Sequence, residues 1–288
     1  MELLELWARF LEEVRVFFKT KGYLEVTTPL LLEYPNLDAN VEPIELLVKE
    51  RGVSKRRWLA TSPEPPMKKL LARYKRDLFQ ITKVFRNDEV GRYHRVEFHM
   101  LEWYAVGCDY RYLIAELKQL LKRLLGIKDF KVVELDELFK KRFGSSLPKD
   151  ADGLKKLLNR AGVNYEEGED WETLFFRALL ELESELKEGA VFVVGFPAAF
   201  TPLARSKNGR AERVELYLNG VEIANGWTEE TDAEKVKKDL EREARRRGLP
   251  LDEEFVRAHG EMPPATGCSL GLDRLFTFYA GLDELPSF

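Results

Sequence analysis

The chain contains very few cysteines. Cys108 and Cys268 are the only two in 288 residues, and neither belongs to a CxxC pair or stands beside a histidine. This usage excludes a disulfide framework and a structural zinc site, and it indicates thiols that stay reduced. The simplest interpretation is that both are buried side chains.

Long apolar runs are also missing. No stretch of about 20 apolar residues, the length needed to span a bilayer, occurs in the sequence. Apolar residues recur at helical spacing over residues 1–18, but charged residues such as Glu5, Arg9 and Glu12 interrupt them. An amphipathic helix is therefore predicted there, and not a signal peptide. We expect a cytoplasmic protein without membrane association.

Excess positive charge and glycine-rich phosphate loops are absent as well. The net charge is -4 and the isoelectric point is about 5.7, which does not indicate a broad nucleic-acid-binding surface. Neither GxGxxG nor a P-loop occurs, so side chains must supply most contacts to any bound phosphate. What the chain does have is 44% hydrophobic residues, enough for a substantial core.

The order of the expected elements indicates the fold class. Strands are predicted around residues 23–32, 78–104 and 190–225, whereas residues 128–188 keep mainly to helical periodicity. Strands joined by hairpins in one part and helices grouped in another predict an α+β fold with an antiparallel sheet, and not a doubly wound sheet. We expect a single domain over residues 1–288, with residues 128–188 as a mostly helical insertion.

One hairpin carries an unusual number of charges for a segment with a buried pattern. It reads FRNDEVGRYHRVEFHMLEWY over residues 85–104. A period of two places Arg86 and Asp88 on one face of the outgoing strand, and Met100 and Glu102 on one face of the returning strand. Buried charges of this kind are costly unless they are paired. A ligand-lined floor explains the mixture; the alternative is a structural ion pair between Arg86 and Glu102.

Two further segments offer groups suited to a charged ligand. RVELYLNGVEIANG presents Glu215, then Glu222 and Asn225 after a turn at Asn219 and Gly220. Paired carboxylates near a triphosphate suit Mg²⁺, although a solvated hairpin is the alternative. In GLDRLF a glycine allows close backbone approach before a helix start, which taken alone is unremarkable.

Together these segments resemble the catalytic core of class II aminoacyl-tRNA synthetases. The hairpin is similar to motif 2, GCSLGLDR to motif 3, and GYLEVTTPLL to motif 1 with Pro29 as its proline. TSPE, FPAAFTPLAR and VEIANGWTEETD resemble the lysyl-tRNA synthetase branch. Those synthetases carry an anticodon-binding domain ahead of motif 1, for which we expect no room here. The chain therefore resembles the freestanding elongation factor P lysyltransferases.

The resemblance implies a function and its participants. Lysine, preferably (R)-β-lysine, would be activated with ATP and Mg²⁺ as an adenylate, then transferred to a lysine side chain of elongation factor P. Positioning and charge neutralisation would dominate catalysis, because the substrate carboxylate itself attacks the α-phosphorus. A homodimer formed through motif 1 is implied, and no charging of tRNA.

The resemblance also implies residue roles at the nucleotide. Arg86 would bind the α-phosphate and the substrate carboxylate in bidentate geometry, and Arg274 the γ-phosphate, which makes both catalytic. Glu215 and Glu222 would hold Mg²⁺, and Phe98 would stack on adenine. The residues implied for ATP are Arg86, Asn87, Asp88, Arg95, Phe98, Glu215, Leu216 (through its backbone), Gly271 and Arg274. Arg95 stands where the family often has Asn.

For the amino acid, carboxylates matched to a diamine are implied. Glu64 would receive one ammonium, and Glu102 and Glu229 the other, because a buried ammonium without such partners is strongly disfavoured. The implied residues are Ser62, Pro63, Glu64, Glu102, Tyr104, Glu222, Asn225, Glu229 and Ser269. Ser269 departs from the glycine of lysyl-tRNA synthetases and from the alanine usual in the lysyltransferases.

Three other functions stay open. The chain could be a fragment that still charges tRNA, an amide-forming ligase of the asparagine synthetase type, or a regulatory paralogue that only binds an amino acid. The intact motifs argue against the last of these. An aspartate substrate would require a cation in the side-chain pocket, against which the acidic residues argue.

Overall fold

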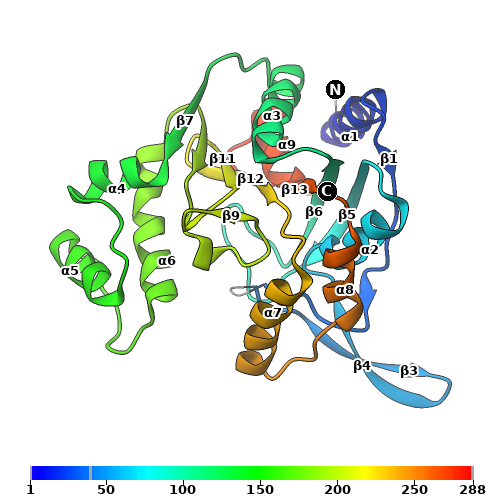
Figure 1. Ribbon diagram of the computed structural model, residues 1–288. Helices are drawn as coiled ribbons and strands as arrows, with labels where there is room; N and C mark the ends of the chain where they lie inside the picture. The colour runs from blue at the N-terminus through cyan, green and yellow to red at the C-terminus, as the bar shows by residue number, and fades with distance from the viewer. Residues whose placement is uncertain (1, 39–40, 287–288) are drawn as a thin grey trace.

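The computed structural model describes residues 2–38 and 41–286, and its centre is one eight-stranded sheet (Figure 1). The strand order is β1-β5-β6-β13-β12-β11-β8-β7. The strands are β1 (Leu24–Glu25), β5 (Leu78–Phe85), β6 (Glu97–Val106), β13 (Ala265–Gly271), β12 (Val221–Thr228), β11 (Arg213–Leu218), β8 (Ala190–Val194) and β7 (Phe130–Glu134). Neighbours from β5 to β8 pair antiparallel, whereas the edge strands β1 and β7 pair parallel. The predicted α+β fold is confirmed.

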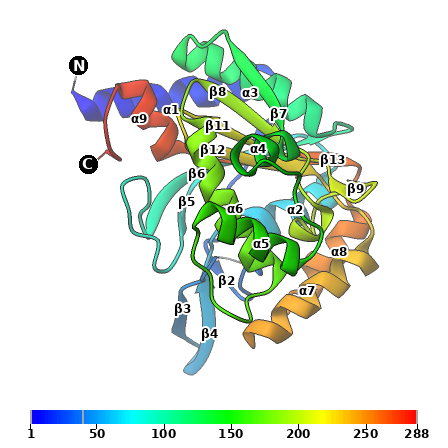
Figure 2. The same cartoon turned by 90° about the vertical axis from the view of Figure 1, so that its left-hand side faces the viewer.

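Three helices cover one face of this sheet. They are α1 (Leu3–Thr20), α3 (Tyr110–Leu125) and α9 (Leu272–Ala280), which lie together above the sheet in Figure 2. Asp109 caps α3 by accepting a hydrogen bond from the Arg111 amide, and Gly126 ends it with φ 70°. Their apolar faces and the sheet form the main hydrophobic core, so this side of the sheet is closed to ligands.

The opposite face is covered only at its two ends. At one end lie α2 (Glu64–Tyr74), α7 (Ala233–Arg247) and α8 (Glu253–Glu261), and at the other lie α4 (Leu135–Phe143), α5 (Ala151–Ala161), α6 (Trp171–Leu182) and the short η1 (Glu183–Leu186) (Figure 1). Each group has a hydrophobic core of its own. The strands between the two groups form the floor of a cavity.

Small elements complete the fold. A three-stranded sheet has the order β2 (Leu31–Leu32), β4 (Val53–Leu59), β3 (Glu45–Glu50), and β9 (Ser206–Lys207) pairs with β10 (Arg210–Ala211) near η2 (Ala198–Phe200). The strand predicted over residues 23–32 consists of two separate two-residue strands around Pro29, because proline cannot donate to a ladder. In the described part of the chain, no helix is long and apolar enough to cross a membrane.

The predicted helical insertion contains a strand. Helices α4, α5 and α6 lie within residues 128–188 as predicted, but Phe130–Glu134 forms β7, which pairs with β8 at the edge of the main sheet. Its exposed edge position gives the weak burial pattern that hid it from sequence periodicity. The insertion is therefore anchored to the sheet.

A β-bulge shapes the hairpin of β11 and β12. Glu215 pairs with Asn225 and Leu216 with Ala224, but Tyr217 pairs with Glu222, so Ile223 has no direct partner. Glu222 and Asn225 are three positions apart, so in a regular strand without a bulge their side chains would point to opposite faces. The bulge brings both to the cavity. The predicted turn at Asn219 and Gly220 is confirmed, and both residues have positive φ, 48° and 85°.

Candidate active site

A cavity of about 720 Å³ lies on the open face of the sheet. Its floor includes a lateral row of four directly paired residues from four strands: Glu102, Ser269, Asn225 and Glu215. A second row of paired residues lies two positions further along the same strands and therefore on the same face. It consists of Tyr104, Gly267, Trp227 and Arg213. Alternation along the strands thus gathers residues far apart in the sequence on one surface.

Glu102 is the central carboxylate of the cavity. Its side chain is 3% exposed; one oxygen accepts from the Tyr104 hydroxyl at 2.6 Å and the other from Ser62 Oγ at 3.0 Å. Burial, followed by the nearby charge of Glu64, raises the pKa of Glu102 to about 8. No ion pair joins Glu102 to Arg86, so that alternative is wrong. Within the described part of the chain, the ionised form of such a buried carboxylate lacks a positive partner in direct contact, so binding of a cation beside it is favourable.

Lys68 lies among the predicted carboxylates, but it was not predicted as a site residue from the sequence. Its Nζ is 2.7 Å from an oxygen of Glu64 and 2.7 Å from an oxygen of Glu229. Glu229 is buried, and burial raises its pKa to about 7 although Lys68 opposes the shift. The spacing of Glu64 and Lys68 was visible in the sequence, but it is also that of an ordinary surface pair on a helix.

Arg86 and Arg274 line the other end of the cavity. Arg86 Nε donates to the Thr61 carbonyl at 3.3 Å, and Nη1 lies 3.5 Å from Glu89. Its guanidinium lies 5.2 Å from the centre of the Phe98 ring. Arg274, in the first turn of α9, completes this positively charged end. Two guanidinium groups facing one cavity suit the phosphates of a nucleotide.

A buried arginine links two of the predicted residues. Arg213 donates to Asn225 Oδ1 at 3.0 Å, to Thr201 Oγ1 at 2.9 Å and to Glu215 Oε1 at 2.5 Å. Its guanidinium also lies 4.6 Å from the centre of the Phe196 ring. Arg213 is the first residue of the alternating segment and lies two positions before Glu215, but only the acids and the amide of this segment were selected from the sequence.

Glu215 and Glu222 are the carboxylates that could face a metal ion. Glu215 is 3% exposed, and burial together with the Glu222 charge raises its pKa to about 7 even though Arg213 opposes this. A solvated hairpin is therefore excluded. Among the described residues, no group of three or more His, Cys, Asp or Glu could hold a metal by itself. Glu215 already accepts from Arg213 at one oxygen and from the Tyr217 hydroxyl at the other, 2.8 Å away, so a divalent ion held by these carboxylates would take most of its ligands from phosphates and water.

Most of the predicted site residues line this one cavity. They are Ser62, Glu64, Arg86, Phe98, Glu102, Tyr104, Glu215, Glu222, Asn225, Glu229, Ser269, Gly271 and Arg274.

Five predicted residues are not among its lining residues. Pro63 precedes α2 as its N-cap, and Leu216 is fully buried in the opposite core. Asn87 and Asp88 are exposed, because β5 ends at Phe85 and Asp88 takes φ 58°, which ends the alternation on which its predicted facing depended. Glu89 reaches the cavity instead.

Arg95 is the fifth. Its guanidinium donates hydrogen bonds to the backbone carbonyls of Leu285 and Pro286, beside the main cavity.

Comparison with known proteins agrees with this geometry. Residues 1–286 match the family described as tRNA synthetases class II (D, K and N). A protein of Aquifex aeolicus named elongation factor P–(R)-β-lysine ligase homolog is 59% identical over 288 residues, covering 100% of this chain and 98% of its own length. Elongation factor P–(R)-β-lysine ligases of Avibacterium paragallinarum and Haemophilus influenzae are each 36% identical, covering 96% and 93% of this chain and 91% and 88% of their own lengths. The chain belongs to the class II tRNA synthetase family, in the group of the elongation factor P–(R)-β-lysine ligases.

Proposed function

We propose that the protein activates lysine, with (R)-β-lysine as the preferred isomer, using ATP and Mg²⁺, and transfers the aminoacyl group to a lysine side chain of elongation factor P. The carboxylate-lined pocket around Glu102 carries this proposal. The names of the relatives support the choice of (R)-β-lysine and of elongation factor P. Residues 1–288 would act as one catalytic domain.

The charge of the pocket matches a diamine. Glu64, Glu102 and Glu229 contribute three negative charges when ionised, and Lys68 contributes one positive charge, which leaves two negative charges. Lysine and β-lysine each bring two ammonium groups. Asp38 is a further carboxylate of the cavity, and burial followed by the Glu64 charge raises its pKa to about 6, although Arg86 and Lys68 oppose this shift. An aspartate substrate would add negative charge to this pocket and is disfavoured.

The other end of the cavity suits the chemistry of activation. Arg86 would hold the substrate carboxylate and the α-phosphate in line, and Arg274 would hold the γ-phosphate, so that the carboxylate oxygen attacks the α-phosphorus and pyrophosphate leaves. Glu215 and Glu222 would hold Mg²⁺, which would supply charge that neutralises the phosphates. The acceptor amine then attacks the carbonyl carbon of the adenylate, AMP leaves, and an amide forms. Phe98 would pack against the adenine.

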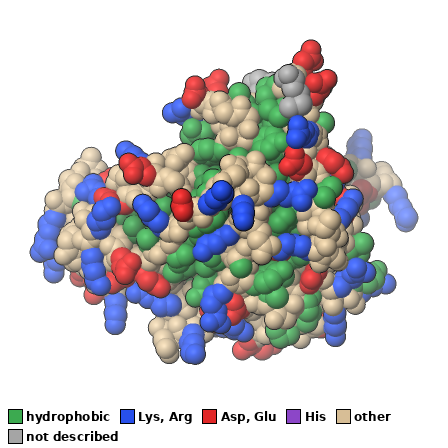
Figure 3. All heavy atoms as spheres, turned by 90° about the horizontal axis from the view of Figure 1, so that it is seen from above, with side chains coloured by type: hydrophobic (Ala, Val, Ile, Leu, Met, Phe, Trp, Pro, Cys, Tyr) green, Lys and Arg blue, Asp and Glu red, His purple; other side chains and the backbone are tan. Residues whose placement is uncertain are grey.

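We also propose a protein acceptor and a homodimer. A tRNA partner demands phosphate-neutralising Lys and Arg over a wide surface, whereas the face shown in Figure 3 mixes basic and acidic side chains and the net charge is -4. Leu24 and Leu31, in the segment that resembles motif 1, are each 43% exposed. The exposure of these apolar side chains supports a dimer in which a second copy of the chain buries them.

Pyrophosphate exchange with a panel of amino acids tests the activation step. Exchange that depends on lysine or β-lysine, with none for aspartate or asparagine, supports the proposal. Exchange with aspartate would instead favour an enzyme of the asparagine synthetase type.

A further inference from the structure

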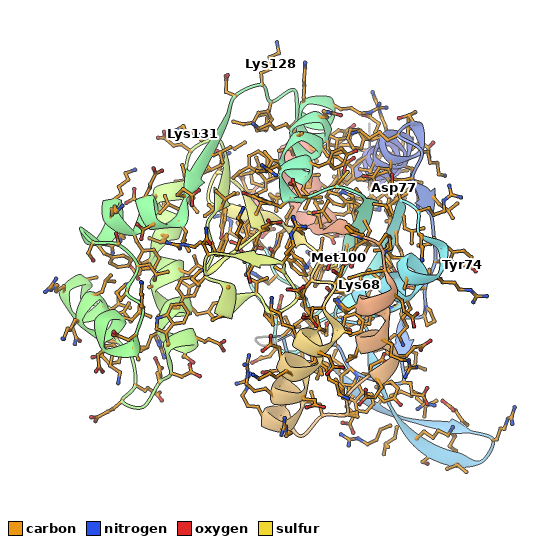
Figure 4. All side chains as sticks on the ribbon, in the orientation of Figure 1. Lys68, Tyr74, Asp77, Met100, Lys128 and Lys131 are labelled. Carbon is orange, nitrogen blue, oxygen red and sulfur yellow. The ribbon has the colours of Figure 1, made fainter. Side chains whose placement is uncertain are left out.

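Lys68 is the most deeply buried charged side chain beside the amino-acid pocket. Its exposed fraction is 0%, and Figure 4 shows it in the interior of the molecule, far from peripheral Lys128 and Lys131. Nζ bridges Glu64 Oε1, one helical turn earlier, and Glu229 Oε2 just after β12, each at 2.7 Å. Burying an ammonium is costly, so this one depends on both carboxylates.

The pKa of Lys68 shows which effect dominates. Burial by itself would lower the pKa of this ammonium, but attraction to Glu229 and then Glu64 outweighs burial and raises it above its usual value. Lys68 is therefore charged at any physiological pH. Apolar side chains in place of Lys68 and both of its carboxylate partners would avoid the desolvation cost, so stability alone does not explain a charged cluster here.

The contact with Lys68 determines how Glu229 faces the pocket. Oε2 of Glu229 contacts Lys68 and accepts from Trp227 Nε1 at 3.1 Å. Oε1 is left on the other side, where no group within residues 2–38 and 41–286 donates a hydrogen bond to it. This oxygen lies beside Gly267, where a Cβ would be only 2.5 Å from it and 2.4 Å from the Tyr104 ring. The carboxylate thus keeps one buried oxygen, beside Gly267 and the Tyr104 ring, to which no described residue donates a hydrogen bond.

The other ionisable groups around Lys68 do not compete for this role. His259 on α8 donates from Nδ1 to the Glu230 carbonyl, 2.7 Å away, and burial followed by the Lys68 charge lowers its pKa to about 3. His259 is therefore neutral. Tyr104 also stays neutral, since burial and then Glu102 raise its pKa. Glu102 and Asp38 are further titratable carboxylates near this cluster, and Glu64 and Lys68 both influence their pKa values.

We propose that Lys68 is a positioning residue that determines specificity: by bridging Glu64 and Glu229 it fixes their carboxylates and cancels one of the three pocket charges, so that the pocket accepts two ammonium groups. This inference rests on the proposed lysine-activating function. Lys68 touches neither ATP nor the reacting carboxylate, and acts through the acids that receive the substrate.

Lys68→Met tests the proposal, with Lys68→Gln as a second, more polar replacement. The matched control is Lys69→Gln, because Lys69 is the next residue of α2 but pairs with Asp252 and Glu254 outside the pocket, each at 2.8 Å. The readouts are kcat and KM for lysine and for ATP in pyrophosphate exchange, lysine binding by calorimetry, and the pH profile of kcat/KM for lysine.

We expect the Lys68 variants to raise KM for lysine at least tenfold while KM for ATP changes less than threefold. Without the ammonium, the pKa of Glu229 rises further, so the acidic limb of kcat/KM for lysine should move to higher pH. In Lys68→Met with Glu64→Gln, the pocket again has two uncompensated carboxylates, and the limb should return toward its original pH. The Lys69 control should match the unaltered protein.

Several outcomes would overturn the role of Lys68. If the acidic limb of kcat/KM for lysine does not shift, or if KM increases equally for lysine and for ATP, Lys68 has only a structural role. If the single variants do not fold, the charge-matched double variant still decides, because an acidic limb at the original pH supports the proposal and a shifted one overturns it. If the unaltered protein binds lysine without catalysing exchange, the proposed activity fails while the binding comparison still tests Lys68. No lysine binding at all would overturn both.

Discussion

Arg274 donates a hydrogen bond from Nη1 to the backbone carbonyl of Glu222, 2.9 Å away. That carbonyl belongs to the residue that the bulge in β12 brings to the cavity. Nε of Arg274 donates to the Tyr93 carbonyl at 3.0 Å, which ties the same side chain to the β5–β6 hairpin. The guanidinium is therefore oriented by two separate segments before any ligand arrives, as preorganised charge stabilisation requires.

Replacing either cavity arginine should abolish adenylate formation. We expect Arg86→Ala and Arg274→Ala each to lower pyrophosphate exchange by two to three orders of magnitude, about 2.7 to 4 kcal/mol of barrier, because each removes a fixed donor to phosphate charge. Thermal unfolding should change little, since neither side chain is part of the hydrophobic core. Near-normal exchange in either variant would show that its role is misassigned.

Glu222→Gln should act through Mg²⁺. Activity should fall and then recover in part as the Mg²⁺ concentration rises, because a weaker ligand set is compensated by mass action. A titration of exchange rate against Mg²⁺ measures this. An identical Mg²⁺ dependence in both proteins would remove Glu222 from the metal site.

Ser269 is expected to influence the choice between α-lysine and β-lysine. It lies directly between Glu102 and Asn225 in the floor, and its Oγ is 3.4 Å from the Asn225 carbonyl. Ser269→Gly removes volume and a hydroxyl beside both residues, so acceptance of α-lysine relative to β-lysine should increase. The ratio of the two kcat/KM values is the measurement, and an unchanged ratio contradicts the assignment.

Binding of lysine should release protons near neutral pH. Glu102 has a pKa of about 8 in the free protein, so it is mainly protonated at pH 7, and an arriving ammonium lowers that pKa. Affinity should therefore increase as pH rises from 6 toward 8. Calorimetry in buffers of different ionisation enthalpy counts the released protons. Glu102→Gln should reduce the count, and an equal count in both proteins would rule out Glu102 as their source.

The C-terminal segment should affect the nucleotide more than the amino acid. Arg92 and Tyr93 both donate to the Asp283 carbonyl, at 3.0 and 3.3 Å, and so join this segment to the hairpin that carries Arg86. Truncation after Leu282 should raise KM for ATP several-fold and leave KM for lysine nearly unchanged. Equal changes in the two constants would count against this link.

Much of the fold followed from periodicity, and the exceptions have physical causes. The β5–β6 hairpin and α1 were predicted because their patterns are strong and local. The edge strand β7 and the helix α8 were not, since the first is largely exposed and the second was not distinguished from its surroundings.

The site could be predicted in its residues but not in its arrangement. Motif resemblance located Glu102 and Glu229, yet nothing local indicated that Lys68 would lie between Glu229 and Glu64, because the contact joins residues 161 positions apart. Likewise, alternation alone would have separated Glu222 from Asn225, since a bulge leaves no clear sequence mark.

The identity of the product tests the central claim most directly. The protein is incubated with ATP, labelled lysine or (R)-β-lysine, and either purified elongation factor P or total tRNA. Our account predicts label on elongation factor P that resists acid and hydroxylamine, as an amide does, with none on tRNA. Base-labile label on tRNA, with none on the protein, would contradict it.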